Sequence, residues 1–188
     1  MLEERHKTFS IKYILPNSIT YMNMLLGLGA IFISMLGGTN NFKIASKLIL
    51  FAGITDKLDG YVARKLNSIS KFGKELDSLC DLVSFGIAPI ILWWSMSIEG
   101  FKVLEILSAM FFVGSAIFRL ARFNISEDDG YLQGLPITIA GMIVALKFIL
   151  DINFRNIYIN NIIYYENPIM LIFLSLLMVS TFRVKKPL

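Results

Sequence analysis

The sequence is poor in several residue types, and each shortage excludes a class of protein. Cys80 is the single cysteine, so no intrachain disulfide framework is available. Only 17% of the 188 residues are charged, against 55% that are hydrophobic, and the mean hydropathy is +0.64. A soluble globular domain is less apolar than this. No basic run interleaved with aromatic residues suggests nucleic-acid binding. The composition indicates a membrane protein.

The sequence contains long hydrophobic stretches with few charged residues. A helix needs about 20 mostly apolar residues to cross a bilayer, and six stretches approach that length. They are residues 14–36, 44–60, 76–96, 103–120, 135–150 and 162–182. No internal repeat, low-complexity tract or long linker divides the chain. The sequence therefore predicts an all-α integral membrane bundle of six transmembrane helices, in a single domain over residues 1–188.

Lys and Arg are distributed unevenly among the predicted connections. Twelve of them, including Arg5, Lys7 and Lys186, lie in the two termini and in the second-to-third and fourth-to-fifth connections, against four in the remaining connections. Short cytoplasmic loops of membrane proteins carry an excess of Lys and Arg. Both termini are therefore expected to face the cytosol.

Four aspartates interrupt the second and third hydrophobic stretches. A central Asp costs about 2.5 to 3.5 kcal/mol in a membrane helix, so four of them need compensation. Positions 56, 59, 60 and 63 follow i, i+3, i+4, i+7 spacing, and positions 73, 77 and 81 follow i, i+4, i+8 spacing, so each set shares one helix face. Antiparallel neighbours joined by a brief basic turn can direct both faces into one cavity.

Carboxylates so close together would repel one another unless cations lay between them. Their oxygen ligands suit hard divalent ions, Mg²⁺ or Mn²⁺ first, and two ions about 3.5 to 4 Å apart would fit. No Cys or His lies at the ligand spacing of a zinc site. The predicted metal ligands are Asp56, Asp59, Asp77 and Asp81.

Small residues accompany the aspartates on the same faces. Gly60, Ala63 and Gly73 leave room beside the ions, so a planar base or a diphosphate could approach the helix backbones. Arg64 could then contact a phosphate. The alternative is that Gly and Ala simply allow the close helix packing that is common in membranes.

These spaced residues resemble the signature of the CDP-alcohol phosphotransferases. The pattern Asp56-x2-Asp59-Gly60-x2-Ala63-Arg64-x8-Gly73-x3-Asp77-x3-Asp81 matches that signature without a departure. Four further segments resemble the phosphatidylserine synthase branch of the family. They are Pro-Asn-Ser-Ile-Thr at 16–20 with Asn23, Phe-Gly-Ile-Ala-Pro at 85–89, Arg-Leu-Ala-Arg-Phe-Asn at 119–124 and Gly-Leu-Pro at 134–136.

The resemblance implies a six-helix transferase of phospholipid biosynthesis in the cell membrane, usually a homodimer, with its active site open to the cytosol. Its substrates would be CDP-diacylglycerol and L-serine, and its products phosphatidylserine and CMP. Asp56, Asp59 and Asp77 would hold the metal ions, and Asp81 would contact one ion and act as the general base. The residues implied to line the nucleotide site are Gly60, Ala63, Arg64 and Gly73.

Two further sets of polar residues are candidates for substrate contacts. Arg119 and Arg122, with Asn124 beyond them, could bind the carboxylate of serine. They could equally be lipid-facing anchors, and they would also suit a phosphate-bearing acceptor. Asn17, Thr20 and Asn23 form a polar stripe in the first stretch, which either contacts the donor diphosphate or links helices by hydrogen bonds.

Three alternatives remain open from the sequence. A sister transferase could use the same donor class with glycerol 3-phosphate, inositol phosphate or another alcohol. Intramembrane aspartates could also line a cation transport pathway, although the later stretches contribute almost no acidic residues away from their ends. A non-catalytic membrane scaffold would leave the four carboxylates without compensation.

Overall fold

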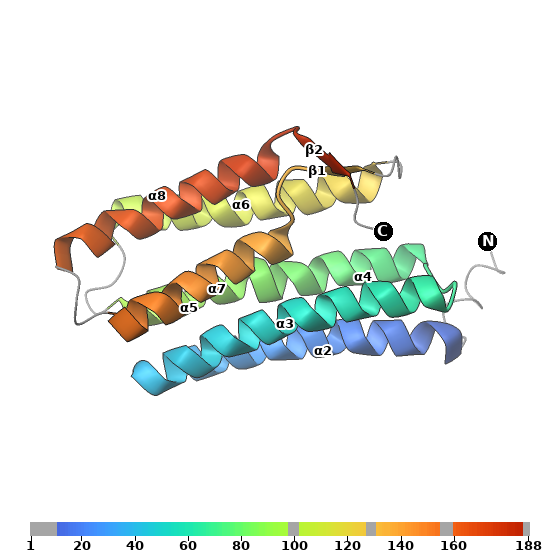
Figure 1. The fold of residues 1–188 in the computed structure, drawn as a ribbon, viewed down its shortest axis with the longest axis horizontal. Helices are drawn as coiled ribbons and strands as arrows, with labels where there is room; N and C mark the ends of the chain where they lie inside the picture. Colours follow the sequence, from blue (N-terminus) through green and yellow to red (C-terminus); the bar gives the residue numbers. More distant parts are fainter. Residues whose placement is uncertain (1–10, 98–101, 127–130, 155–159, 186–188) are drawn as a thin grey trace.

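A computed structural model describes residues 11–97, 102–126, 131–154 and 160–185. The basic residues Arg5, Lys7 and Lys186 lie outside this range. The described part forms six rods of helix (Figure 1). Five of the rods are single helices, and the third along the chain is a composite. The elements are α2 (Ile11–Met35), α3 (Thr39–Lys65), α4 (Lys71–Asp81), η1 (Leu82–Ile87), α5 (Ala88–Met96), α6 (Val103–Ile125), α7 (Ile137–Phe154) and α8 (Asn160–Val179). The third rod is α4 and α5 joined through η1, a π-helical turn.

Four of the rods are long and apolar enough to cross a membrane. They are Tyr13–Met35, Lys71–Met96, Val103–Ile125 and Ile137–Phe154. Helix α3 is 27 residues long, but it carries Asp56, Lys57 and Asp59 within its apolar part. Helix α8 contributes a shorter apolar segment, Glu166–Val179. The chain is therefore a helical integral membrane protein, as its composition predicted.

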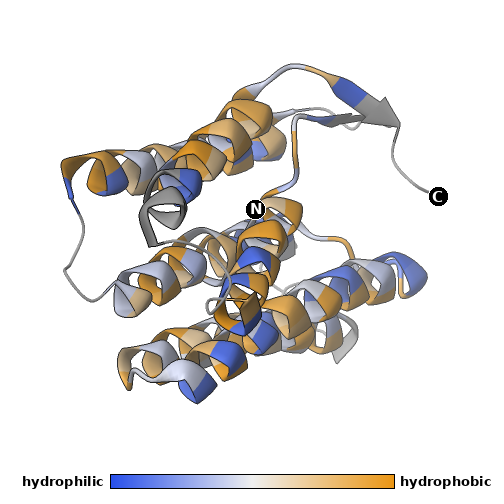
Figure 2. Ribbon diagram, turned by 60° about the vertical axis from the view of Figure 1, so that its left-hand side comes forward, coloured by the Kyte–Doolittle hydropathy of each residue, from blue (hydrophilic) through white to orange (hydrophobic). Residues whose placement is uncertain are grey.

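Polarity is distributed in the opposite way to that of a soluble protein. Large apolar side chains face outward, among them Phe32, which is 66% exposed, and Met110, which is 67% exposed. Asn23 and Ser84 are completely buried. Figure 2 shows hydrophobic residues along the lengths of the helices. Outward apolar faces are stable in lipid, where a buried polar group needs an internal partner.

The π-helical turn η1 is packed between α2 and α7 at two glycines. A Cβ atom on Gly27 of α2 would lie 2.4 Å from Ser84 Oγ, and one on Gly141 of α7 would lie 2.6 Å from Phe85 Cβ. Larger residues at either position would push the helices apart. Because η1 directly follows Asp81, this packing fixes the backbone beside the predicted site.

One end of the bundle gathers the start of α2, the connection from α3 to α4, the end of α6 and a small sheet (Figure 1). In that sheet β1 (Tyr131–Gln133) pairs antiparallel with β2 (Arg183–Lys185), with Tyr131 opposite Lys185. This pair of strands was not predicted from the sequence. Helix α4 begins at this same end, where Ser70 Oγ accepts a hydrogen bond from the backbone N–H of Gly73, a conventional N-cap.

Candidate metal centre and nucleotide site

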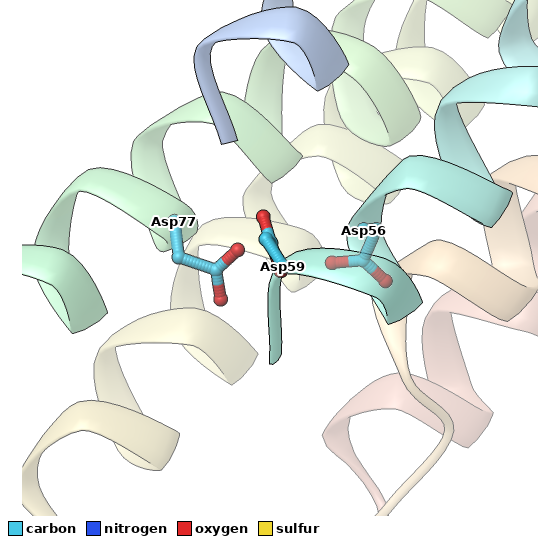
Figure 3. A group of neighbouring side chains, drawn as sticks. All are labelled: Asp56, Asp59 and Asp77. Atoms are coloured by element: carbon cyan, nitrogen blue, oxygen red, sulfur yellow. The ribbon is translucent and has the colours of Figure 1, made fainter. Parts of the chain in front are cut away.

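Three aspartates from two helices converge at the centre of the candidate site. Asp56 and Asp59 of α3 and Asp77 of α4 each offer a carboxylate oxygen, and these oxygens lie within 4.8 Å of one another. Figure 3 shows Asp77 and Asp59 on neighbouring helices, with Asp56 about one turn before Asp59 on α3. We call these three residues the aspartate cluster. A cluster of this size offers enough oxygen ligands to hold a divalent cation.

Helical periodicity places the cluster on the inner face of α3. Asp59 is buried and Asp56, Gly60 and Ala63 are half-buried, whereas Lys57 between the two aspartates is exposed. On α4, Gly73 and Asp77 are half-buried and Asp81 is buried in the same way. Both shared faces predicted from the spacing are therefore present.

The hydrogen bonding of the cluster is incomplete in a way that suits a cation. Asp59 Oδ2 and Asp77 Oδ1 are buried without a hydrogen-bond partner among the described residues. Asp56 Oδ2 accepts a hydrogen bond of 3.1 Å from Thr138 Oγ1 on α7. Buried carboxylate oxygens normally have partners, and hard divalent ions prefer ligands of this kind. The residues present therefore fit the metal that the resemblance implied.

Asp81 lies beside the cluster but is held differently. It is 6% exposed, its side chain neighbours that of Asp56, and its Oδ1 accepts a 3.1 Å hydrogen bond from Asn23 Nδ2. It is not one of the three residues whose oxygens converge. Its predicted contact with a metal ion stays a prediction, and the structure adds a partner that the spacing did not predict.

The small residues adjoin the acidic face, as the nucleotide-site prediction requires. A Cβ atom on Gly73 would lie 3.1 Å from Ser70 Oγ and 3.3 Å from Asn17 Oδ1, and one on Gly60 would lie 3.6 Å from Arg64 Nη1. The exposed Arg64 thus turns back over Gly60, while Ala63 is half-buried. Both glycines keep side-chain volume away from polar neighbours, and the nucleotide contact itself stays a prediction.

The predicted polar stripe on α2 divides into three different environments. Asn17 lies beside Gly73. Thr20 is buried and donates a hydrogen bond to the carbonyl of Pro16 in its own helix. Asn23 binds Asp81. Asn17 is therefore placed next to Gly73 of the predicted nucleotide site, while the side chain of Thr20 also neighbours Asp59 of the aspartate cluster.

Arg119 brings a positive charge into the acidic region. It is 8% exposed, and its Nε has no hydrogen-bond partner among the described residues. Its charge interacts with those of Asp81, Asp56 and Asp77, and its guanidinium lies 5.7 Å from the ring centroid of Phe123. A buried guanidinium with an unused donor is a candidate for binding an anionic group.

Arg122, one turn further along α6, is engaged in a structural contact. Its Nη1 donates to the carbonyl of Val179, and its Nη2 donates to those of Met178 and Ser180. We call this group of hydrogen bonds the α8 carbonyl cap, because it satisfies the carbonyls at the end of α8. The predicted contact of Arg122 with an acceptor would require some of these bonds to be replaced.

Asn124 links α6 to α4 through its side chain. Its Oδ1 accepts a hydrogen bond of 3.1 Å from Ser78 Oγ, and its Nδ2 donates one of 2.9 Å to Glu75 Oε2. Lys74 Nζ also donates to the carbonyls of Phe123 and Asn124. These bonds hold α6 against α4 and place Arg119 near Asp77.

Thr138 is the residue beside the cluster that sequence reasoning missed. It is 7% exposed and binds Asp56 across 82 residues of sequence. It follows the Gly134-Leu135-Pro136 segment by two residues, which was the one available signal. No spacing rule connects a threonine of α7 with an aspartate of α3.

Comparison with known proteins agrees with this geometry. The fold and the aspartate cluster define a membrane-embedded protein with a candidate divalent-cation site. The profile of the CDP-alcohol phosphatidyltransferase family matches residues 13–182. The chain belongs to this family, which confirms the resemblance found in the sequence.

Several relatives carry informative names. A CDP-diacylglycerol–serine O-phosphatidyltransferase of Methanocaldococcus jannaschii is 38% identical over 180 residues, covering 95% of this chain and 78% of the relative. The protein of that name from Helicobacter pylori is 38% identical over 175 residues, covering 91% and 71%. An archaetidylserine synthase of Methanothermobacter thermautotrophicus is 39% identical over 134 residues, covering 70% and 56%.

Proposed function

We propose that this chain is a CDP-diacylglycerol–serine O-phosphatidyltransferase, which transfers the phosphatidyl group to L-serine and releases CMP. The observation that carries the proposal is the aspartate cluster, whose buried oxygens lack partners among the described residues, within a chain of this family. The relatives named above contribute the acceptor, because serine is part of each of their names.

The proposed placement is in the cytoplasmic membrane, with six spans and with the termini and the site on the cytosolic side. The start of α2, the α3 to α4 connection and β2 lie at one end of the bundle (Figure 1). This end holds Arg64 and Lys65 at the end of α3 and Lys71 and Lys74 at the start of α4, and an excess of positive charge marks the cytosolic side. A homodimer is proposed as the working assembly.

Most of the predicted site residues have a proposed role. Asp56, Asp59 and Asp77 hold divalent metal, Mg²⁺ or Mn²⁺ and two ions in all, while Gly60, Ala63, Arg64 and Gly73 receive the nucleotide beside Asn17. Ions held by these aspartates would supply positive charge to neutralise the diphosphate and the departing CMP. Arg119 binds the carboxylate of serine in this proposal, and its buried Nε, which has no protein partner among the described residues, supports that role.

Asp81 is the proposed general base. The proton of the serine hydroxyl goes to the Asp81 carboxylate as the serine oxygen forms a bond to the phosphorus that carries the lipid. The bond from that phosphorus to the oxygen of CMP breaks, and its electron pair leaves with CMP. Asp81 is buried next to Asp56, so it is close to the proposed metal ligands without belonging to the converging group.

A direct assay tests the proposal. Purified protein in detergent or nanodiscs is supplied with CDP-diacylglycerol, Mg²⁺ or Mn²⁺, and one acceptor at a time. CMP release is expected with L-serine, and it should stop without serine or when EDTA removes the metal. Activity with glycerol 3-phosphate or inositol phosphate but not with serine would replace the proposed acceptor. Release that does not depend on metal would contradict the role of the aspartate cluster.

A further inference from the structure

Asn23 makes a hydrogen bond to another helix, which is one of the two roles predicted for the polar stripe. It lies in the middle of α2 and is completely buried. Its side-chain amide reaches across 58 residues of sequence to donate a 3.1 Å hydrogen bond to Asp81 Oδ1. A carboxylate without a proton can only accept, so this bond fixes which end of the amide faces Asp81.

The backbone of Asn23 is held against the same part of the third rod. Ser84 Oγ of η1 donates a 3.0 Å hydrogen bond to the carbonyl of Asn23. One turn further along α2, Gly27 allows Ser84 to pack so closely that a Cβ atom on the glycine would lie 2.4 Å from Ser84 Oγ. Asn23 is therefore fixed at its side chain by Asp81 and at its backbone by the turn that follows Asp81.

This arrangement separates Asn23 from the residues proposed to receive the donor. Asn17, two turns earlier, lies beside Gly73 of the proposed nucleotide site, whereas the Asn23 amide nitrogen is directed at Asp81. A residue that contacts a diphosphate would need its donor groups turned toward that ligand.

We propose that Asn23 is a positioning residue for Asp81: its amide holds Oδ1 and so orients the carboxylate to receive the serine proton at Oδ2. The inference rests on the proposed function, because Asp81 needs this orientation only if it acts as the base. A general base must be within hydrogen-bond reach of its proton in the correct direction. Without the amide, the Asp81 carboxylate is expected to rotate toward other partners.

The test separates orientation of the base from binding of the donor. Asn23→Ala is expected to lower kcat by about 10- to 100-fold, the usual loss when a group that orients a functional side chain is removed. The KM for CDP-diacylglycerol and the Mn²⁺-dependent affinity for CDP, measured by calorimetry, are expected to change less than about twofold. Ser34→Ala is the matched control, because Ser34 is also completely buried in α2 but its hydroxyl binds only the carbonyl of Ile31 among the described residues.

Asn23→Ser provides a second variant should Asn23→Ala fail to fold, because it fills part of the space and keeps a short donor. A double-mutant comparison adds a further readout: in an Asp81→Asn background, Asn23→Ala should cause no additional loss of residual activity. A raised KM for the donor or a loss of CDP affinity, with kcat unchanged, would overturn the inference. An unchanged kcat and KM in a folded variant would overturn it as well. Absence of serine-dependent CMP release by the unaltered protein would instead contradict the proposed function.

Discussion

Two polar groups within the same bundle differ in how fully their hydrogen bonds are satisfied. In the α8 carbonyl cap, both terminal nitrogens of Arg122 donate to backbone carbonyls at the end of α8. In the aspartate cluster, Asp59 and Asp77 each keep a buried oxygen without a partner among the described residues. A buried polar group with all its hydrogen bonds stabilises the fold. A buried group without a partner destabilises the fold but remains able to bind a ligand. For this pair, the difference distinguishes a structural group from a functional candidate.

Removing one carboxylate is the strongest way to test this difference. Asp77→Asn is expected to lower kcat by about 1,000-fold or more, because a metal ligand and its charge are lost together. The melting temperature without metal should stay level or rise, since one of several mutually repelling carboxylates has become neutral. Activity and thermal unfolding in detergent measure the two effects.

Glu75→Gln is the matched control for Asp77→Asn. It makes the same chemical change on the same helix, but Glu75 is exposed and lies outside the cluster. It should leave kcat within about threefold of the original value. A large, equal loss in both variants would show that α4 tolerates no change of charge, and the comparison would fail.

The two arginines of α6 allow the same substitution to be made in each environment, at Arg119 near the aspartate cluster and at Arg122 in the α8 carbonyl cap. Arg119→Met is expected to raise the KM for serine by about tenfold or more, since a guanidinium with an unused donor is lost. Arg122→Met should instead lower the free energy of unfolding by about 2 to 3 kcal/mol, because carbonyls at the end of α8 lose their donors. Steady-state kinetics and thermal unfolding of both variants test whether Arg119 affects mainly the KM for serine and Arg122 mainly the stability. The reverse pattern would exchange the roles assigned to the two residues.

Thr138 tests how far the cluster depends on its neighbours. Thr138→Val keeps the shape of the side chain but removes the hydrogen bond to Asp56, and kcat is expected to fall by about tenfold at limiting Mg²⁺. Added Mg²⁺ should recover part of this loss, because the orientation of a ligand affects metal affinity. Thr55→Val is the control, since its hydroxyl donates to the carbonyl of Ala52 in its own helix. Equal effects at both positions would remove Thr138 from the site.

Substitution of Gly134 has the smallest expected effect, and it should change stability rather than catalysis. Its φ is +68°, and a Cβ atom there would lie 2.5 Å from the carbonyl oxygen of Met178. Gly134→Ala should therefore lower the free energy of unfolding by about 1 to 3 kcal/mol, with the KM values unchanged in the folded fraction. Gly114→Ala should be neutral or slightly stabilising, because a Cβ there meets nothing within 4 Å. Equal destabilisation by both would contradict the reading of Gly134 as a backbone-limited position.

The helices and the acidic faces could be predicted because both depend on local spacing. Hydrophobic length placed the six helices, and helical periodicity placed Asp56 and Asp59 on one face and Asp77 and Asp81 on another, where the structure has them. The boundaries moved, since the second stretch, predicted at 44–60, extends to Thr39–Lys65. Charged residues near membrane interfaces continue a helix beyond its apolar part, so hydropathy alone shortens it.

Contacts between distant segments could not be predicted in this way. Thr138 meets Asp56 and Asn23 meets Asp81 only after three-dimensional packing. The different environments of Arg119 and Arg122 depend on where α8 ends, and nothing in the sequence of α6 contains that information. The pairing of β1 with β2 could not be predicted for the same reason, because each strand is three residues long and the two lie far apart in the chain.

The π-helical turn has a consequence for the third rod as a whole. A residue added to one turn rotates everything beyond it by about 100° around the helix axis. Helix α4, which bears Asp77 and Asp81, and helix α5, which ends at Met96, therefore differ in rotational register about the shared axis, although a continuous run of backbone joins them. The side chains of α5 therefore point in directions that the helical spacing within α4 would not predict.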